Sequence, residues 1–306
     1  MTESAVAGLV LDGDSHGVEW HLELDRRQLL PGRLVGGRMS LRAAQTVEAR
    51  GVVVALDAEE HWRHRETTRD ANGTTTTRVV TSRDELLREP VLVHGPLRLT
   101  AGETWQATFE LPVPGMGPAS LDAEDAGLSW TLAAKLDIDD GFDSSIAGPV
   151  VVAQPTALLR AGAVHVGEFA LYERADVAID GITGTIGFEP MPLVCGEAFS
   201  GRVALELPGS VKLQEIRAEL RIQVEATVSG GESETITAWS GQLAPEGTYQ
   251  GSVSFDISGS LDPRPLPTIE LPHGRTQTTF HVVLAKALAV DTHLARDVTI
   301  ATTREI

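Results

Sequence analysis

Alternation of apolar and polar residues over short spans dominates the chain. VEWHLELD (residues 18–25), ARGVVVALDAE (49–59), TWQATFELPV (104–113) and EIRAELRIQVEATV (215–228) alternate or run apolar over the length of a strand. Gly, Pro or Asp residues separate such spans, and no span predicts an amphipathic helix longer than three turns. SRDELLREPV, from Ser82, fits either one helical turn or an edge strand. Many short strands with regular turn signals predict an all-β protein built from sandwiches or barrels.

One phrase of eleven residues occurs twice. PGRLVGGRMSL begins at Pro31 and CGEAFSGRVAL begins at Cys195, 164 residues further on. In the same register Val52 falls on Ile216, and every second residue of both following strands is apolar. The two copies therefore present the same face to a core.

The register of the repeat changes further along the chain. LTAGETW, ending at Trp105, matches LAPEGTY, ending at Tyr249, at an offset of 144. The first copy therefore carries about 20 additional residues, between positions 60 and 97. Two copies of one β-sandwich are the simplest interpretation, with domains at 1–160 and 161–306.

Paired glycines have a structural explanation in this scheme. Gly32 and Gly196 precede strands, where a turn with positive φ favours glycine. Gly37 and Gly201 fit a bulge or a close approach of the opposite sheet. These positions predict fold and carry no chemistry.

The order of the first-half motifs matches a known family. LVGGRMSL, VVVALDAEEHW, a polar hairpin, LTAGETWQATFELPVP and GLSWTLAAKLDI follow one another. Over roughly residues 18–153 this order closely resembles the arrestin-type β-sandwich, and residues 182–302 resemble it more loosely. KLDIDDGFDSSIAGPVVVAQP is similar to the bacterial sporulation-control branch of that family. The resemblance implies two tandem arrestin-like (immunoglobulin-like) β-sandwich domains.

The same resemblance implies a non-enzymatic adaptor or scaffold whose concave sheet faces and hairpin loops hold other proteins. Some arrestin-type proteins recognise phosphorylated peptides with Lys and Arg near the front of the first sandwich. This chain has no matching cluster that can be assigned residue by residue, so phosphate recognition is not carried over.

Composition and charge limit the partners. The 306 residues carry a formal net charge of −18, which disfavours broad contact with nucleic acid or an anionic lipid surface. The single cysteine, Cys195, excludes an internal disulfide framework and a Cys-based zinc site. MTESAVAGLVLDGDSHG shows no signal peptide, and IAGPVVVAQPTALL is too short and proline-interrupted to span a membrane. We expect a cytoplasmic protein without an integral membrane segment.

Two hairpins are the candidate contact points for partner proteins, together with the groove between domains. Asn-Gly between RETTRDA and TTTTRVV predicts a type I′ turn joining two polar strands, and SGGES predicts a shorter hairpin. The candidate protein-binding residues are Arg65, Arg69, Asn72, Gly73, Arg78, Gly230 and Gly231. The alternative is a solvated hairpin whose charges only block edge-to-edge pairing, and unprotected edges would permit a strand-mediated homodimer.

Other chemistry receives little support from the sequence. His61 and His64 would point to opposite faces of a strand, and Asp137–Ser145 resembles only part of a calcium loop. No catalytic, cofactor-binding or metal-binding residue is predicted. A small-molecule or carbohydrate-binding sandwich is the alternative function, and it would need two or three tryptophans exposed on one face. The candidates are Trp20, Trp62, Trp105, Trp130 and Trp239.

Overall fold

The computed structural model describes residues 8–115, 117–159, 165–168, 170–171, 181–287 and 291–305. These described residues are all-β, as predicted, with one 3-10 turn at Thr156–Leu158. The segment from Ser82 is part of a strand and not a helical turn. No helix within these described ranges has the length and apolar character needed to cross a membrane.

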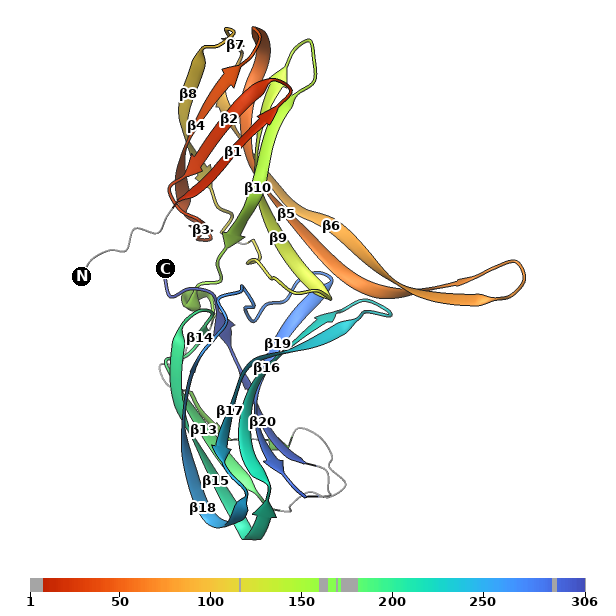
Figure 1. The fold of residues 1–306 in the computed structure, drawn as a ribbon, viewed down its shortest axis with the longest axis vertical. Coiled ribbons are helices and arrows are strands. Elements are labelled where there is room, and N and C mark those ends of the chain that lie inside the picture. The colour runs from red at the N-terminus through yellow and green to blue at the C-terminus, as the bar shows by residue number, and fades with distance from the viewer. Residues whose placement is uncertain are drawn as a thin grey trace, which may run out of the picture. The chain divides into compact units, whose positions relative to one another are not determined.

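The first compact unit holds the described residues up to His61 together with Ser82–Leu121 and Gly127–Ala153. Its four-stranded sheet has the order β1 (Leu9–Ser15), β2 (Val18–Leu24), β4 (Leu34–Ala43), β8 (Thr104–Pro112). The second sheet has the order β3 (Gln28–Leu29), β10 (Ser144–Val152), β9 (Ala126–Ile138), β5 (Val47–Arg69), β6 (Thr75–His94), and β7 (Leu97–Leu99) pairs with β5 (Figure 1).

Alternation along these strands fills the space between the two sheets. Leu22 and Leu41 of the first sheet and Val54 and Leu132 of the second have no exposed surface. The Nε1–H group of Trp20 donates a 2.8 Å hydrogen bond to the hydroxyl of Ser144, so a polar contact also joins the sheets. The period-two pattern of the sequence therefore specifies the core.

The second compact unit holds Trp62–Thr81, Asp122–Ala126 and the described residues from Gln154 onward. One sheet has the order β11 (His165–Glu168), β13 (Thr183–Glu189), β15 (Ala198–Leu213), β18 (Gly247–Ser260). The other has the order β12 (Ala170–Leu171), β20 (Thr292–Val298), β19 (Gly274–Ala285), β16 (Glu215–Ala226), β17 (Ser233–Ala244). β14 (Leu193–Val194) pairs in parallel with β21 (Ile300–Ala301).

Aromatic rings lie at the centre of the second unit. The rings of Phe188 on β13 and Phe280 on β19 meet edge to face with centroids 5.0 Å apart, which joins the two sheets. Phe199 on β15 and Trp239 on β17 extend this cluster, with centroids 5.5 Å apart.

In the described residues the order β1-β2-β4-β8 of the first unit recurs as β11-β13-β15-β18, and β10-β9-β5-β6 recurs as β20-β19-β16-β17. The edges differ, because β3 pairs in parallel with β10 whereas β12 pairs antiparallel with β20. Gly32 and Gly196 have φ values of 75° and 77°, which confirms their predicted turns. The boundary between the two domains predicted from sequence, at residues 160 and 161, lies outside the described residues. Residues 62–81, assigned to the first domain from sequence, group with the second compact unit.

The expectation for Gly37 and Gly201 needs correction. Both lie within strands, and the close approach comes from the neighbouring strand of the same sheet and not from the opposite sheet. A Cβ on Gly37 would lie 2.3 Å from Cζ of Phe109, which is its cross-strand partner on β8. A Cβ on Gly201 would lie 2.5 Å from the carbonyl oxygen of Gly187 and 3.1 Å from Ile257. Glycine is needed at both positions because the adjacent strands occupy the space of a side chain.

Candidate partner-binding ribbon

The outer ends of β5 and β6 form a two-stranded ribbon, residues 62–81, which closes in the hairpin predicted around Asn72 (Figure 1). Every residue from Thr67 to Val79 is exposed, so both faces of this outer part are open to solvent. We call residues 67–79 the outer ribbon. A two-stranded hairpin is at best marginally stable by itself in water, so local pairing and anchoring must hold it in shape.

The turn of the ribbon differs from the predicted type I′ turn. The amide of Gly73 donates to the carbonyl oxygen of Asp70 at 3.0 Å, and the amide of Asp70 donates to that of Thr74 at 3.0 Å. Gly73 has a φ of 85°, whereas Asn72 is not among the residues with positive φ. These features describe a type I turn followed by a left-handed glycine, which is the three-residue hairpin loop.

The side chain of Asp70 explains the choice of turn. Its Oδ1 atom accepts hydrogen bonds from the amides of Asn72 at 2.9 Å and Thr74 at 2.8 Å. Because the carboxylate of Asp70 bonds to main-chain groups two and four residues ahead, Asp70 and Thr74 flank the loop, which has three residues. A two-residue Asn-Gly loop would begin one residue later. The hairpin position was therefore predicted correctly and the turn type was wrong.

Cross-strand contacts pair the outer ribbon along its length. The hydroxyls of Thr67 and Thr77 are 3.1 Å apart, and Nη2 of Arg78 lies 3.1 Å from a carboxylate oxygen of Glu66. Nε of Arg69 donates to the carbonyl oxygen of Gly73 at 3.2 Å. Arg69 and Arg78 keep their charged groups in solvent, where a partner could reach them.

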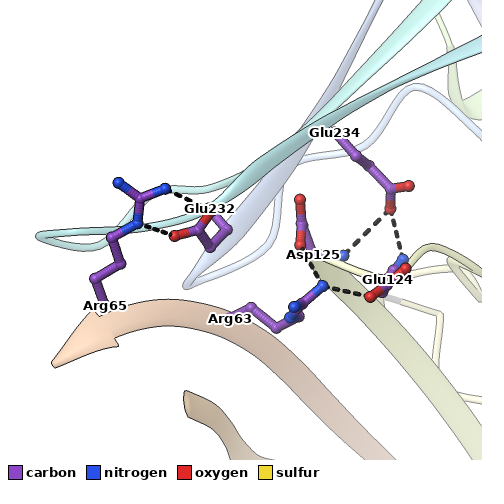
Figure 2. Close-up of polar contacts among 6 residues, drawn as sticks. All are labelled: Arg63, Arg65, Glu124, Asp125, Glu232 and Glu234. Atoms are coloured by element: carbon purple, nitrogen blue, oxygen red, sulfur yellow. Dashed lines mark hydrogen bonds and ion pairs between the residues drawn. The ribbon is translucent and has the colours of Figure 1, made fainter. Parts of the chain in front are cut away.

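The base of the ribbon brings together predicted residues from both hairpins. The amide of Arg65 donates to the carbonyl oxygen of Gly230 at 2.8 Å, and the amide of Glu232 donates to that of Arg63 at 3.0 Å. Nε of Arg65 lies 2.5 Å from a carboxylate oxygen of Glu232 (Figure 2). The turn between β16 and β17 therefore pairs with the edge of β5, and these contacts join the two hairpins.

Arg63 anchors the ribbon to a third segment, the acidic loop at residues 122–126. Its Nη1 atom pairs with the carboxylate of Glu124 and lies 3.1 Å from that of Asp125 (Figure 2). Oε1 of Glu234 accepts hydrogen bonds from the amides of Glu124 at 2.6 Å and Asp125 at 3.2 Å. Burial raises the pKa of Asp125, Arg63 opposes this rise, and the carboxylate of Glu234 adds to it.

Gly230 and Gly231 permit this close packing. Gly230 has a φ of 72°, and a Cβ on it would lie 3.0 Å from the carbonyl oxygen of Arg65. A Cβ on Gly231 would lie 2.0 Å from the carbonyl oxygen of Ala226. The structure thus gives Arg65, Gly230 and Gly231 an internal role at the base, while Arg69, Asn72, Gly73 and Arg78 occupy the exposed end. Their part in partner binding stays a prediction.

Sequence reasoning did not identify the anchor residues Glu124, Asp125, Glu232 and Glu234. The available signals are the acidic segments DAEDAG and GGESE, each rich in carboxylates near a glycine. Neither segment lies near the arginines in the chain, since Arg65 and Glu232 are separated by 167 positions. Only tertiary structure connects them.

Replacing Arg63 by methionine is expected to lower the free energy of unfolding of the second unit by about 1–3 kcal/mol. The change keeps the aliphatic stem and leaves the carboxylate of Asp125, whose side chain is only 10% exposed, without its cation. Urea denaturation would measure the loss, and hydrogen exchange at the amides of Arg65 and Glu232 would report release of the base. Arg78→Met is the control, since its guanidinium is 68% exposed and its ion pair should contribute at most about 0.5 kcal/mol. Equal effects of the two substitutions would contradict the anchoring role of Arg63.

One motif that sequence reasoning overlooked is GDSHG, residues 13–17, which matches Gly-x-Ser-x-Gly. The structure places it at the turn between β1 and β2, where His16 and Gly17 have φ values of 51° and 75°. Ser15 closes β1, and its carbonyl oxygen accepts a 2.7 Å hydrogen bond from the hydroxyl of Ser144. A nucleophile elbow joins a strand to a helix, so this segment has the geometry of a hairpin turn instead.

Two aspartates of the segment Asp137–Ser145 are paired with neighbouring cations. Nζ of Lys135 lies 2.5 Å from Asp143, and Nη2 of Arg50 lies 2.6 Å from Asp137. No group of three or more metal-ligating side chains gathers within the residues that the structure describes. Burial raises the pKa of the Cys195 thiol, which disfavours the reactive thiolate.

A groove on the outer face of β2, β4 and β8 bears on the small-ligand alternative. Nδ1 of His21 lies 2.6 Å from Asp12, its Nε2 lies 2.9 Å from Glu23, and Glu23 also pairs with Arg38. The hydrogen bonds that His21 makes to Asp12 and, to a smaller extent, to Glu23 raise its pKa. The charges in this groove therefore already compensate one another.

The tryptophans do not form the exposed cluster that a carbohydrate site would require. Trp20 and Trp130 are 3% and 1% exposed, and Trp62, Trp105 and Trp239 are half-buried. Trp62 stacks on His273 with ring centroids 3.9 Å apart. None of the five belongs to the exposed large apolar residues.

Comparison of the chain with protein-family models gives no match, and comparison with curated proteins gives none either. Function must therefore be argued from the geometry of the ribbon itself.

Proposed function

We propose that the chain is a non-enzymatic adaptor that binds other proteins, with the outer ribbon as its principal contact surface. The observation that carries the proposal is that residues 67–79 are exposed on both faces and yet form regular paired strands. Ordering these residues costs conformational entropy that burial of apolar surface does not offset. A segment held in shape from its base, with its side chains in solvent, is suited to present those side chains to a partner.

The chemistry of the outer ribbon favours a protein partner with an acidic or extended segment. Arg69 and Arg78 place positive charge on a chain whose net charge is −18, and threonine hydroxyls lie between them. Exposed strands add main-chain donors and acceptors, which supply affinity while side chains supply selection. The resemblance to arrestin-type sandwiches supports the same class of function. The more specific proposal is a cytoplasmic regulatory role similar to that of the sporulation-control branch.

A pull-down with purified variants tests the proposal. In the first variant a short glycine-containing turn replaces residues 66–80, which keeps Arg63 and Arg65 at the base. The second variant is Arg78→Glu, and its matched control is Arg98→Glu on β7. The two arginines are equally exposed, at 68%, and each pairs with one glutamate. Circular dichroism verifies that each variant folds.

We expect specific proteins to be retained by the intact chain, lost by the ribbon replacement and reduced by Arg78→Glu, with Arg98→Glu unchanged. Proteins identified by mass spectrometry are then purified and titrated against the same four chains. Equal retention by all of them would overturn the assignment of binding to the ribbon. Equal loss with both charge reversals would indicate non-specific attraction to basic residues.

A further inference from the structure

The free edge of β6 has no neighbouring strand in the described residues. β6 ends the order of its sheet, and only β5 pairs with it. Residues 75–81 read TTTRVVT, which is rich in β-branched residues and holds a single charge, and Val79 is 44% exposed. Proline and charged side chains are among the features that protect edge strands, and residues 75–81 contain no proline and one charge. This stretch can accept another strand.

The hairpin contacts fix which main-chain groups point to that edge. The amide of Asp70 donates to the carbonyl oxygen of Thr74, so the main-chain groups of these two residues face each other, and Thr77 lies opposite Thr67. Groups alternate along an antiparallel strand, so even-numbered residues of β6 up to Leu86 direct their N–H and C=O groups toward β5, and the alternation of burial changes phase at Leu86–Leu87. Odd-numbered residues, including Val79 and Thr81, direct them toward the free edge. An added antiparallel copy of the strand must therefore pair odd residues with odd ones and even residues with even ones.

We propose that β6 pairs edge to edge with β6 of a second copy of this chain, about a two-fold axis at Thr81. In this register Arg78 lies opposite Asp84 of the second copy, and the symmetry repeats the pair. Moving the axis by one residue in either direction places Arg78 opposite Ser82 or Leu86 instead. Only the register centred on Thr81, among these three, aligns opposite charges.

Local chemistry supports this register. Asp84 is exposed and forms no ion pair with any residue that the structure describes, so its charge is available. Arg78 and Asp84 would meet as a non-hydrogen-bonded pair, in which opposing side chains are closest. Pairing can extend symmetrically about Thr81 from Thr76 to Leu86, short of the phase change at Leu86–Leu87 and of Pro90.

Sedimentation equilibrium of charge-reversed variants tests the pairing. The intact chain should form dimers, Arg78→Asp and Asp84→Arg should each weaken dimerisation about tenfold or more, and the double reversal should restore it. Each single change places two pairs of like charges across the edge, and the double change recreates opposite charges. A monomeric intact chain at all concentrations, or a double variant as weak as the singles, would overturn the proposal.

Disulfide trapping tests the register separately, in a Cys195→Ser background that removes the only native thiol. Thr81→Cys should form a disulfide-linked dimer on oxidation, because the two copies of residue 81 lie opposite each other. Thr76→Cys is the control on the same exposed strand, and its two copies would be about 33 Å apart. Equally fast linking of both variants would contradict the two-fold axis at Thr81.

This inference and the proposed function can fail separately. Asp84 lies outside the ribbon, so an Asp84→Arg chain that is monomeric and still retains partner proteins would support pairing and leave partner binding intact. A monomeric intact chain that retains partners would overturn the pairing alone.

Discussion

Replacement of Phe280 by alanine should lower the free energy of unfolding of the second unit by about 3–5 kcal/mol. Phe280 is fully buried on β19, and its ring meets Phe188 of the opposite sheet with centroids 5.0 Å apart. The ring of Trp239 lies parallel to it at 6.3 Å. Truncation removes contacts to both sheets and leaves a cavity that rigid strands cannot close, so the cost exceeds the transfer free energy of the ring.

Urea denaturation followed by circular dichroism would measure this loss, with Leu158→Ala as the control. Leu158 belongs to the same unit and is 58% exposed, so its truncation should change the stability by no more than about 0.5 kcal/mol. Comparable losses for Phe280→Ala and Leu158→Ala would mean that the aromatic cluster does not form the core.

Acid is expected to destabilise the second unit through His281, by about 2–4 kcal/mol when its titration is complete. His281 is 1% exposed on β19, and burial lowers its pKa to about 4. Arg221 on β16 and His293 on β20 lower it further, and only Glu219 opposes them. A histidine that is neutral in the fold and has a pKa near 6.5 in the unfolded chain takes up its proton more readily when unfolded.

The sign of this effect follows from the lowered pKa. The contribution of His281 is fully present above about pH 6.5 and is lost as the pH falls from there toward 4. The free energy of unfolding of the intact chain, minus that of His281→Gln, should therefore fall by about 2–4 kcal/mol as the pH is lowered from 6.5 to 4, whatever the fixed cost of the substitution. Parallel curves over this range would show that His281 titrates normally in the fold.

Sequence periodicity predicted the strands because burial on a sheet has a period of two. Val52 and Leu56 in the first unit and Ile216 and Leu220 in the second are all fully buried, as their alternation predicted. The same local logic located the hairpin near Asn72. It did not give the turn type, because the choice depends on one side chain, Asp70, whose carboxylate competes with the Asn-Gly preference.

Contacts between residues far apart in the sequence could not be predicted. Nothing in the spacing of Arg63 relates it to Asp125, and the approach of Gly230 to the carbonyl oxygen of Arg65 depends on both hairpins being folded. The glycine in GGES was correctly associated with a tight hairpin. Only the structure shows that Gly230 also lets the backbone of β5 approach closely.

The exposed construction of the outer ribbon has a consequence for how this chain can change under selection. All of residues 67–79 are exposed, so most substitutions there leave the folding of the rest of the chain almost unaffected. Core positions such as Leu132 and Phe280 have no such freedom. Mutation can therefore explore new surface chemistry on the ribbon while the base and the sheets stay constant. A lineage could exchange one specificity for another without first acquiring compensating mutations in the core.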